Sequence, residues 1–508
     1  MILRPADYAR EDTFDCDVVV VGTGAGGAAC GAELAEAGLS VVFVEEGGYH
    51  PTSSFNPYAT ESIPRLYRDA SGTVIFGTPP IPYVEGRCVG GSTVLNGGMT
   101  WRAPEHVLDA WSKLTGASEL SPAGMEDVYN RVEASIHARP QLDVSIGEDS
   151  RIMAQGATKL GWRHETNHRN QESCVGANNC VLGCPTGAKQ STLVTYMPRA
   201  MARGARVLTE VKVERLLIER GRCVGVVGRA YDPRTRRLDR KVTVRARAVV
   251  IACGAVQTPL LLQNHRIGRP SGQLGKNFLC HPNAKVVGIY GRDVRGWQGV
   301  SQWTQIREFH DEGIVMAENF VPPAALAAYL PFHGAEAWEL MQDYNRMVVS
   351  GVLVEDSTSG TVRRGPFGMA VPRYDITAHD HERFKKGVRL LATLHFAMGA
   401  RRVILPFTDL PIARSEDDLA LIDATQRSRR TLELFTVHLM GTARMGSSAS
   451  SSVVDLGGEL WDLPGCHVAD ASVFPTAIGV NPQVTIMALA TRIAGRIVER
   501  HGALRRAG

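Results

Sequence analysis

The most regular hydrophobic pattern in the chain lies close to its N-terminus. Val18 to Val21 is an unbroken run of β-branched residues, without the polar alternation of a half-exposed strand, so it predicts a strand buried on both faces. Ala28 to Ala37 has a helix-forming composition and Gly38 follows it, which predicts a helix that ends there. A second apolar run, Val41 to Val44, predicts another buried strand. A strand, a helix and a strand within about thirty residues are typical of a dinucleotide-binding α/β unit.

Later parts of the chain carry further helix and strand patterns. The runs between residues 207 and 255 predict a small antiparallel meander, which is followed by a return to the main sheet at Ala248 to Cys253. An amphipathic helix is predicted after Asn481 and Pro482, which places a loop directly before a rigid helix. Further strands and helices are predicted at 285–290 and 346–353 (strands) and at 125–137, 256–264 and 379–398 (helices).

Length and charge exclude some classes of protein. The chain has 508 residues, enough for two or more domains. Its 56 Lys and Arg against 52 Asp and Glu leave a net charge of +4 without a basic cluster, so a nucleic-acid partner is not indicated. The sequence also has no long uncharged apolar stretch to span a membrane, and residues 1–15 lack the apolar core of a secretory signal. We therefore expect a cytoplasmic protein.

A glycine motif sits between the first strand and helix. Gly22, Gly24 and Gly27 form G-x-G-x-x-G: the first allows a tight turn, the second lets a pyrophosphate approach the backbone, and the third lets the helix pack on the strand. The helix N-terminus then faces the phosphates. Glu45, at the end of the second strand, can accept hydrogen bonds from a ribose. The motif predicts dinucleotide binding but leaves NAD and FAD open.

Four separated stretches together resemble the glucose-methanol-choline family of flavin oxidoreductases. They are the glycine unit with Glu45, GRCVGGSTVLNGG at 86–98, HLMGTARMG at 438–446 and VADASVFPTAIGVNPQVTI at 468–486. Within that family, the residues around the cysteines and Asn481 are most similar to the long-chain alcohol oxidases, and the Asn-Pro pair also resembles cholesterol oxidase. The resemblance implies FAD, bound by an α/β Rossmann-like domain and accompanied by a second, α+β substrate-binding domain. The FAD domain is expected to be discontinuous, with parts at 1–104, 191–281 and 436–508, a cap and cysteine loop at 105–190 and the substrate domain at 282–435.

The resemblance also assigns residues to the cofactor. Glu45 would hold the adenosine ribose, and the backbone of Val213 would meet the adenine. Asp470 and Ala471 would reach the diphosphate and the ribityl chain, and the amide of Gln483 is the first after Pro482 able to face the flavin. Leu95 stands where some members attach FAD through a histidine, so we expect noncovalent FAD. The flavin and pyrophosphate would be lined by Gly90, Gly91, Ser92 and Asn96.

The catalytic pair implied by the resemblance is His438 with Asn481. Oxidation of an alcohol needs a group that accepts the hydroxyl proton as hydride leaves, and a histidine suits this role because its pKa lies near working pH. An amide at the second position can orient the substrate oxygen. Read alone, His438 would be a core histidine of a strand and Asn481 a turn residue before proline.

Cys174, Cys180 and Cys184 lie close together on a predicted loop, and Pro185 follows the last of them. The segment resembles the cysteine stretch of iron-sulfur-containing glucose dehydrogenase subunits of the same family, with Val175 in place of one cysteine. That resemblance implies a possible 3Fe-4S cluster. Zinc is disfavoured because the segment has no C-x-x-C pair, and a loop of free cysteines is the alternative.

The motifs, together with the family resemblance, imply FAD-dependent oxidation of an alcohol to an aldehyde or ketone. A hydrophobic or long-chain alcohol is the favoured substrate, and either dioxygen or a redox partner would take the electrons. Alternatives are a sugar or sterol dehydrogenase that passes electrons through a cluster, an electron-transfer subunit, or a noncatalytic FAD-stabilised protein.

Overall fold

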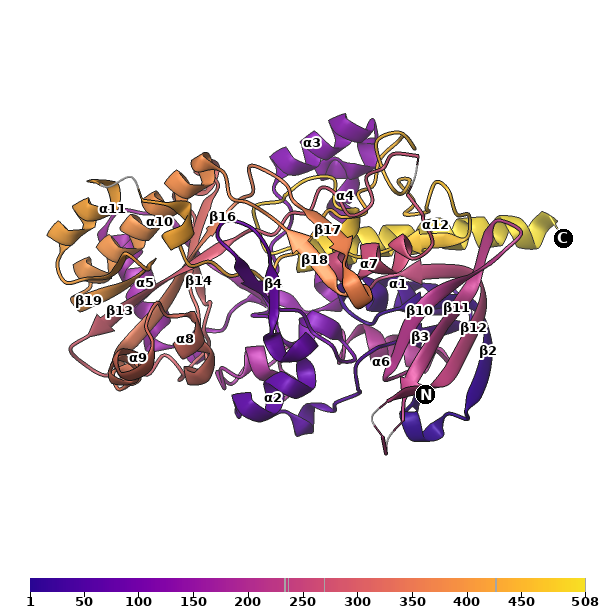
Figure 1. Ribbon diagram of the computed structural model, residues 1–508, viewed down its shortest axis with the longest axis horizontal. Helices are drawn as coiled ribbons and strands as arrows, with labels where there is room; N and C mark the ends of the chain where they lie inside the picture. Colours follow the sequence, from indigo (N-terminus) through magenta and orange to yellow (C-terminus); the bar gives the residue numbers. More distant parts are fainter. Residues whose placement is uncertain (233, 236, 269, 425–426, 508) are drawn as a thin grey trace.

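A computed structural model describes residues 1–232, 234–235, 237–268, 270–424 and 427–507. Within these residues the chain forms two large sheets, which lie side by side along the long axis of the molecule in Figure 1. Helices cover both sheets, and the two sheets have separate hydrophobic cores. This is the α/β architecture with a second, mixed domain that the sequence predicts.

The first sheet has the strand order β1-β9-β3-β2-β12-β11-β10, and β21 also pairs with β12. Its centre is parallel, since β2 pairs with both β3 and β12 in that sense, whereas β10, β11 and β12 form an antiparallel meander. The strands are β1 (Ile2–Leu3), β2 (Glu11–Val21), β3 (Val41–Val44), β9 (Arg206–Leu208), β10 (Val211–Glu219), β11 (Arg222–Tyr231), β12 (Leu238–Ile251) and β21 (Cys466–Val468).

The second sheet has the order β20-β19-β13-β16-β15-β14-β7. β7 comes from a part of the chain far before the other strands and pairs with β14 at one edge. The strands are β7 (His164–Thr166), β13 (Asn283–Tyr290), β14 (Thr304–Ile306), β15 (Ile314–Glu318), β16 (Met347–Val354), β19 (Ala400–Phe407) and β20 (Leu410–Ala413). Three small two-stranded sheets pair β4 (Thr73–Ile75) with β5 (Ile81–Tyr83), β6 (Ala138–Pro140) with β8 (His168–Asn170), and β17 (Thr361–Arg364) with β18 (Ala370–Arg373).

The helices divide between the two sheets. α1 and α12 pack against each other beside the first sheet, and α10 lies on β13, β16 and β19 of the second. The helices are α1 (Ala25–Glu36), α2 (Ala59–Leu66), α3 (Glu105–Thr115), α4 (Pro122–Ser135), α5 (Glu148–Lys159), α6 (Tyr196–Ala202), α7 (Gly254–Gln263), α8 (Pro323–Tyr329), α9 (Gly334–Met341), α10 (Ala378–Ala397), α11 (Ala420–Ala424) and α12 (Gln483–Ala507).

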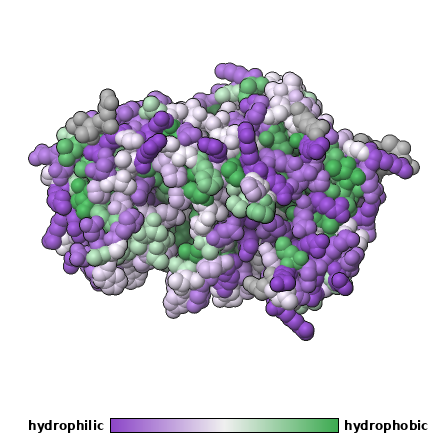
Figure 2. Space-filling model, in the orientation of Figure 1, coloured by the Kyte–Doolittle hydropathy of each residue, from purple (hydrophilic) through white to green (hydrophobic). Residues whose placement is uncertain are grey.

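The molecular surface mixes polar and apolar side chains. On the face drawn in Figure 2, hydrophobic residues form separate patches among hydrophilic ones. Of the helices that the structure describes, none combines the length and the apolar composition that a membrane crossing requires.

Candidate active site

A cavity of about 510 Å³ opens at the carboxyl ends of β2 and β12. This is the edge at which parallel sheets of this type bind ligands. The cavity is lined by segments from the beginning, the middle and the end of the chain. Of the residues predicted to bind a cofactor, its walls contain Gly22, Gly24, Glu45, Gly91, Ser92, Val213, Asp470 and Ala471.

Two of the three motif glycines at the junction of β2 and α1 have no room for a side chain, whereas the third does. Gly22 has φ +100°, and a Cβ there would lie 2.3 Å from the carbonyl oxygen of Ala252. A Cβ on Gly27 would meet the Gly22 oxygen at 2.2 Å, so the helix packs directly on the turn. A Cβ on Gly24 would meet no atom within 4 Å. Gly24 therefore borders open space in the cavity.

Gly26 has the tightest surroundings in this turn, although it is not part of the predicted motif. A Cβ on it would lie 1.8 Å from the carbonyl oxygen of Ala469. This residue directly precedes Asp470, so Gly26 lets α1 press against the C-terminal segment of the site. The only hint in the sequence is the doubled glycine at positions 26 and 27.

The buried carboxylate of Glu45 is held in place by the glycine turn. It accepts hydrogen bonds from the amide and the hydroxyl of Thr23, at 3.0 and 2.7 Å, and from the amide of Gly47 at 2.9 Å. Burial raises the pKa of Glu45 above its ordinary value, and the hydrogen bonds from Thr23 and Gly47 act in the opposite direction. The carboxylate is thus fixed at the end of β3.

Asp470 joins the C-terminal segment to the start of α7. Its Oδ2 accepts hydrogen bonds from the Gly254 amide at 2.8 Å and the Thr258 hydroxyl at 2.6 Å, and its Oδ1 accepts from the amide and hydroxyl of Ser472. Because these four protein donors engage both oxygens, the carboxylate fixes the wall of the cavity, and burial raises its pKa.

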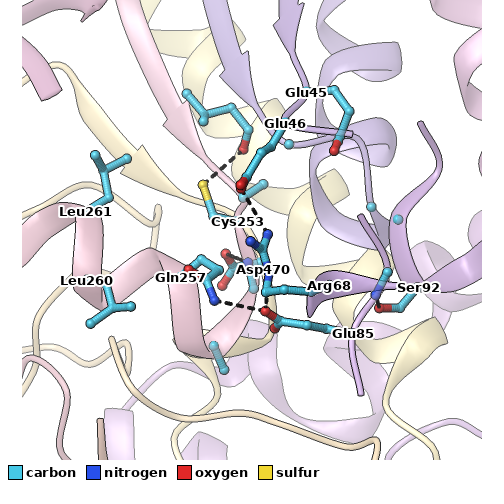
Figure 3. Close-up of a pocket in the computed structure, with 18 of the residues that line it drawn as sticks. Glu45, Glu46, Arg68, Glu85, Ser92, Cys253, Gln257, Leu260, Leu261 and Asp470 are labelled. Atoms are coloured by element: carbon cyan, nitrogen blue, oxygen red, sulfur yellow. Dashed lines mark hydrogen bonds and ion pairs between the residues drawn. The ribbon is translucent and has the colours of Figure 1, made fainter. Parts of the chain in front are cut away.

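A network of charged and polar side chains in the cavity wall was not expected from the sequence. The guanidinium of Arg68 contacts Glu46 at 3.0 Å and Glu85 at 2.5 Å, and the amide of Gln257 donates to Glu85 at 2.9 Å (Figure 3). Arg68 lies in the loop region before the second glycine-rich stretch, and its ion pairs hold that region against the sheet. Nothing in the local sequence marks Arg68, because its partners are distant in the chain.

The second glycine-rich stretch folds against the first. Gly91 has φ +52°, and a Cβ there would lie 2.8 Å from the Cα of Gly24. The backbone amide of Gly90 donates to the Thr23 hydroxyl at 3.1 Å, and the side-chain Nδ2 of Asn96 donates to the Oε1 of Gln483. Gly27, Gly90, Asn96 and Gln483 are not among the residues that line the cavity. The Nε2 of buried Gln483 has no acceptor among the described residues.

His438 and Asn481 lie together, although 43 positions separate them in the sequence. The Nδ2 of Asn481 is 3.2 Å from the Nε2 of His438. Val437 and Leu439, the neighbours of His438, line the cavity, as does Pro482. Burial, together with the nearby His281, lowers the pKa of His438 from 6.5 to about 3. The pair can therefore offer an unprotonated nitrogen and an amide to one ligand.

A second histidine, His281, supports this pair and was missed in the sequence. Its ring packs edge-on against that of His438, with ring centres 5.7 Å apart. Its Nε2 accepts hydrogen bonds from the amides of Ile478 and Gly479, at 3.3 and 3.2 Å, so it anchors the loop that carries Asn481. Its own backbone amide donates to Asp356 at 2.8 Å. The only sequence signal is a His-Pro pair before an apolar strand.

The structure does not support the predicted iron-sulfur cluster. Cys174, Cys180 and Cys184 border one cavity of about 20 Å³, roughly the space for a single water. Arg169 donates to the sulfur of Cys180 at 3.3 Å, and the amide of Lys189 donates to that of Cys184 at 3.4 Å. In the described ranges no group of three or more His, Cys, Asp or Glu side chains is placed to hold a metal ion. The three cysteines are free thiols.

Both a match to a protein family and the similarity to individual proteins give the same family for this chain. The sequence matches the GMC oxidoreductase family over residues 24–283 and 356–490. An uncharacterised GMC-type oxidoreductase of Mycobacterium tuberculosis is 35% identical over 95% of this chain and 76% of its own length. A long-chain-alcohol oxidase of Arabidopsis thaliana is 28% identical over 95% of this chain and 67% of its own length.

Solved structures share the fold at low sequence identity. A formate oxidase of Aspergillus oryzae superposes with a TM-score of 0.71 at 16% identity, over 97% of this chain and all of that one. A pyridoxine 4-oxidase of Mesorbium loti gives 0.70 at 18% identity, over 95% and 99%. The two glycine-rich stretches and the cavity that they enclose agree with this family match. The chain belongs to the GMC oxidoreductase family and is an FAD-dependent oxidoreductase that acts on alcohol-type donors.

Proposed function

We propose that this protein oxidises a primary alcohol with a hydrophobic chain to the aldehyde, with His438 as general base and Asn481 as the group that orients the substrate oxygen. The observation that carries the proposal is the contact between these two side chains, beside residues that line the cofactor cavity. One alcohol hydroxyl can donate to the Nε2 of His438 and accept from the Nδ2 of Asn481. The similarity to long-chain-alcohol oxidases supports the choice of substrate.

The residues of the cavity fit FAD. Bound FAD would supply the hydride acceptor. Gly24 leaves the backbone bare where a pyrophosphate would lie, and Glu45 stands at the end of β3 for a ribose. Val213 would border the adenine, and the open lining at Gly91, Ser92 and Ala471 would follow the rest of the cofactor. The unpartnered Nε2 of Gln483 would find an acceptor on the flavin.

We propose that FAD is held noncovalently. Leu95, in the position where a linking histidine would be expected, is an apolar side chain buried in the core. If this is correct, acid precipitation releases the yellow colour into the supernatant. Colour that stays with the precipitated protein would contradict it.

The first test is anaerobic bleaching of the flavin by a panel of alcohols. The panel runs from short to long 1-alkanols and includes a sterol, a sugar and an aromatic alcohol. We expect the long alkanols to bleach the flavin fastest, and His438→Asn to keep its FAD while flavin reduction slows by about 10²- to 10⁴-fold, the usual contribution of a general base. Exposed His379 offers the matched control His379→Asn, which should reduce at the normal rate.

Two outcomes would contradict this proposal. Normal reduction in His438→Asn would remove His438 from the chemistry. Failure of every alcohol would favour a relay of electrons for a partner. Readmission of air after bleaching identifies the acceptor, because rapid reoxidation indicates dioxygen and slow reoxidation indicates a redox partner.

A further inference from the structure

The central strand β13 carries a buried lysine. Successive side chains of a strand point to opposite faces, and Ala284 and Val286 belong to the core under α10. On the other face, Val287 and Ile289 pack with residues of α8 and α9. Lys285 shares this second face and is only 7% exposed. It therefore lies inside the molecule, at the edge of the apolar patch that α8 and α9 cover.

Lys285 lacks the partners that other buried lysines have. Lys189 donates to three backbone carbonyl oxygens, and Lys385 pairs with Glu382 at 2.8 Å. No carboxylate or carbonyl oxygen among the described residues contacts the Nζ of Lys285, which lies 4.4 Å from the ring centre of Phe435. A buried charge without an anion is costly unless a ligand supplies one.

The position of Lys285 relates it to the catalytic pair. Asn283 and Phe435 exchange two backbone hydrogen bonds of 2.9 Å, and Leu279 and Met440 exchange two of 3.0 Å, so residues 279–283 run antiparallel beside residues 435–440. His281, within this pairing, contacts His438. Lys285 follows His281 by four residues, which is about 13 Å of extended chain. The Lys285 amine lies over the ring of Phe435, three residues before His438, so the lysine and the catalytic histidine contact the same short stretch of chain.

We propose that Lys285 binds a carboxylate at the end of the substrate remote from its hydroxyl group. The substrate class would be hydroxy acids with an apolar chain between the two groups, and this inference rests on the proposed function. One lysine balances one negative charge, which favours a carboxylate over a phosphate. The Oδ1 of Asn283, two residues before Lys285 on the same strand, is buried without a partner among the described residues, and the ring of Tyr329 packs on Phe435, so both polar and apolar groups lie near the amine.

The pKa of Lys285 is consistent with a site that would bind an anion. Burial lowers its pKa from 10.5 to about 7. A carboxylate brought next to the amine would favour the charged form and raise the pKa again. The site is therefore poised to gain a charge when an anion arrives.

The test compares an ω-hydroxy fatty acid with the 1-alkanol of the same chain length. Affinity is read from the concentration dependence of anaerobic flavin reduction. We expect the wild type to bind the hydroxy acid at least about tenfold more tightly than the alkanol, the effect of one charged hydrogen bond. Lys285→Met should remove this advantage while the affinity for the alkanol and the limiting rate stay nearly unchanged. Lys285→Arg should keep it, and exposed Lys113→Met is the control for loss of a surface charge.

A second measurement separates this inference from the proposed function. Calorimetric titration with a fatty acid that has no hydroxyl group should show binding to the wild type and loss of binding in Lys285→Met, with FAD content and melting temperature unchanged. Equal affinity of wild type and Lys285→Met for the fatty acid, or no preference for the hydroxy acid, would overturn the inference. If no alcohol bleaches the flavin, the proposed function fails, and the titration still decides the role of Lys285.

Discussion

At the scale of single residues, the environment of His438 decides how it can act as a base. A free imidazole titrates near pH 6.5, so about half of it is charged there. Burial and the adjacent His281 shift the equilibrium of His438 toward the neutral form. His281 acts by charge repulsion, which disfavours protonation of both rings, and it is itself held neutral by burial while its Nε2 accepts two backbone amides. The base is thus kept ready at neutral pH by its surroundings.

The resulting prediction concerns the pH profile of flavin reduction. A general base works only when unprotonated, and a pKa lowered to about 3 keeps His438 unprotonated as the pH falls through 6.5. We expect the limiting rate of anaerobic reduction to stay flat from about pH 8 down to about pH 5 and to decline only in more acidic solution. Stopped-flow absorbance with a saturating alcohol measures it. A rate that falls by half near pH 6.5 would show that His438 titrates like a free histidine.

At the scale of elements, Gly24 and Gly26, at the junction of β2 and α1, have different structural roles. Gly26 faces the backbone of Ala469, whereas Gly24 faces the open cavity. Gly26→Ala should therefore strain the contact between α1 and the C-terminal segment and lower stability by about 1–3 kcal/mol or more. Gly24→Ala should leave the melting temperature of the FAD-free protein unchanged but weaken FAD binding, by at least about tenfold if it displaces one charged hydrogen bond. Fluorescence titration with FAD and thermal melting distinguish them, and a reversed pattern would refute this division.

The sequence predicted those strands and helices that are specified by a local hydrophobic pattern. The buried run at Val18 to Val21, the helix after the glycines and the meander of β10, β11 and β12 all appear in the structure. β2 extends back to Glu11, because its first half alternates in burial and continues to pair with β12. α1 begins at Ala25, directly after the turn. Periodicity marks where a strand is buried, but the partner strand decides how far it extends.

Contacts between distant segments explain what the sequence could not reveal. The pair of His438 and Asn481 was found only through the family resemblance, since neither residue stands out locally. Arg68 and His281 had no such guide, and their roles depend on partners that folding brings near. For the cysteine segment, the sequence left a cluster and a loop of free thiols both open, and the structure does not support the cluster, because the three thiols border a space of only about 20 Å³.

At the scale of the whole molecule, the cofactor cavity joins segments that are far apart in the chain. The turn after β2, the turn between β12 and α7 and the segment at Asp470 meet there, and β12 lies next to both β2 and β21 in the sheet. Asp470 already bonds α7, and Gly26 already contacts Ala469. A cofactor that contacts all three segments would add a further constraint on the same junction.

FAD should therefore stabilise the fold as a whole. A ligand that binds only the folded state at a free concentration of 100 times its dissociation constant adds about 2.7 kcal/mol to the free energy of unfolding. We expect the melting temperature to rise with added FAD in the wild type and to rise less in Gly24→Ala at the same concentration, because that variant binds FAD more weakly. Differential scanning calorimetry of FAD-free protein, with FAD added in steps, measures both. Equal melting temperatures with and without FAD would mean that the folded chain does not bind FAD at these concentrations, and would contradict the assignment of the cavity at the ends of β2 and β12 to the cofactor.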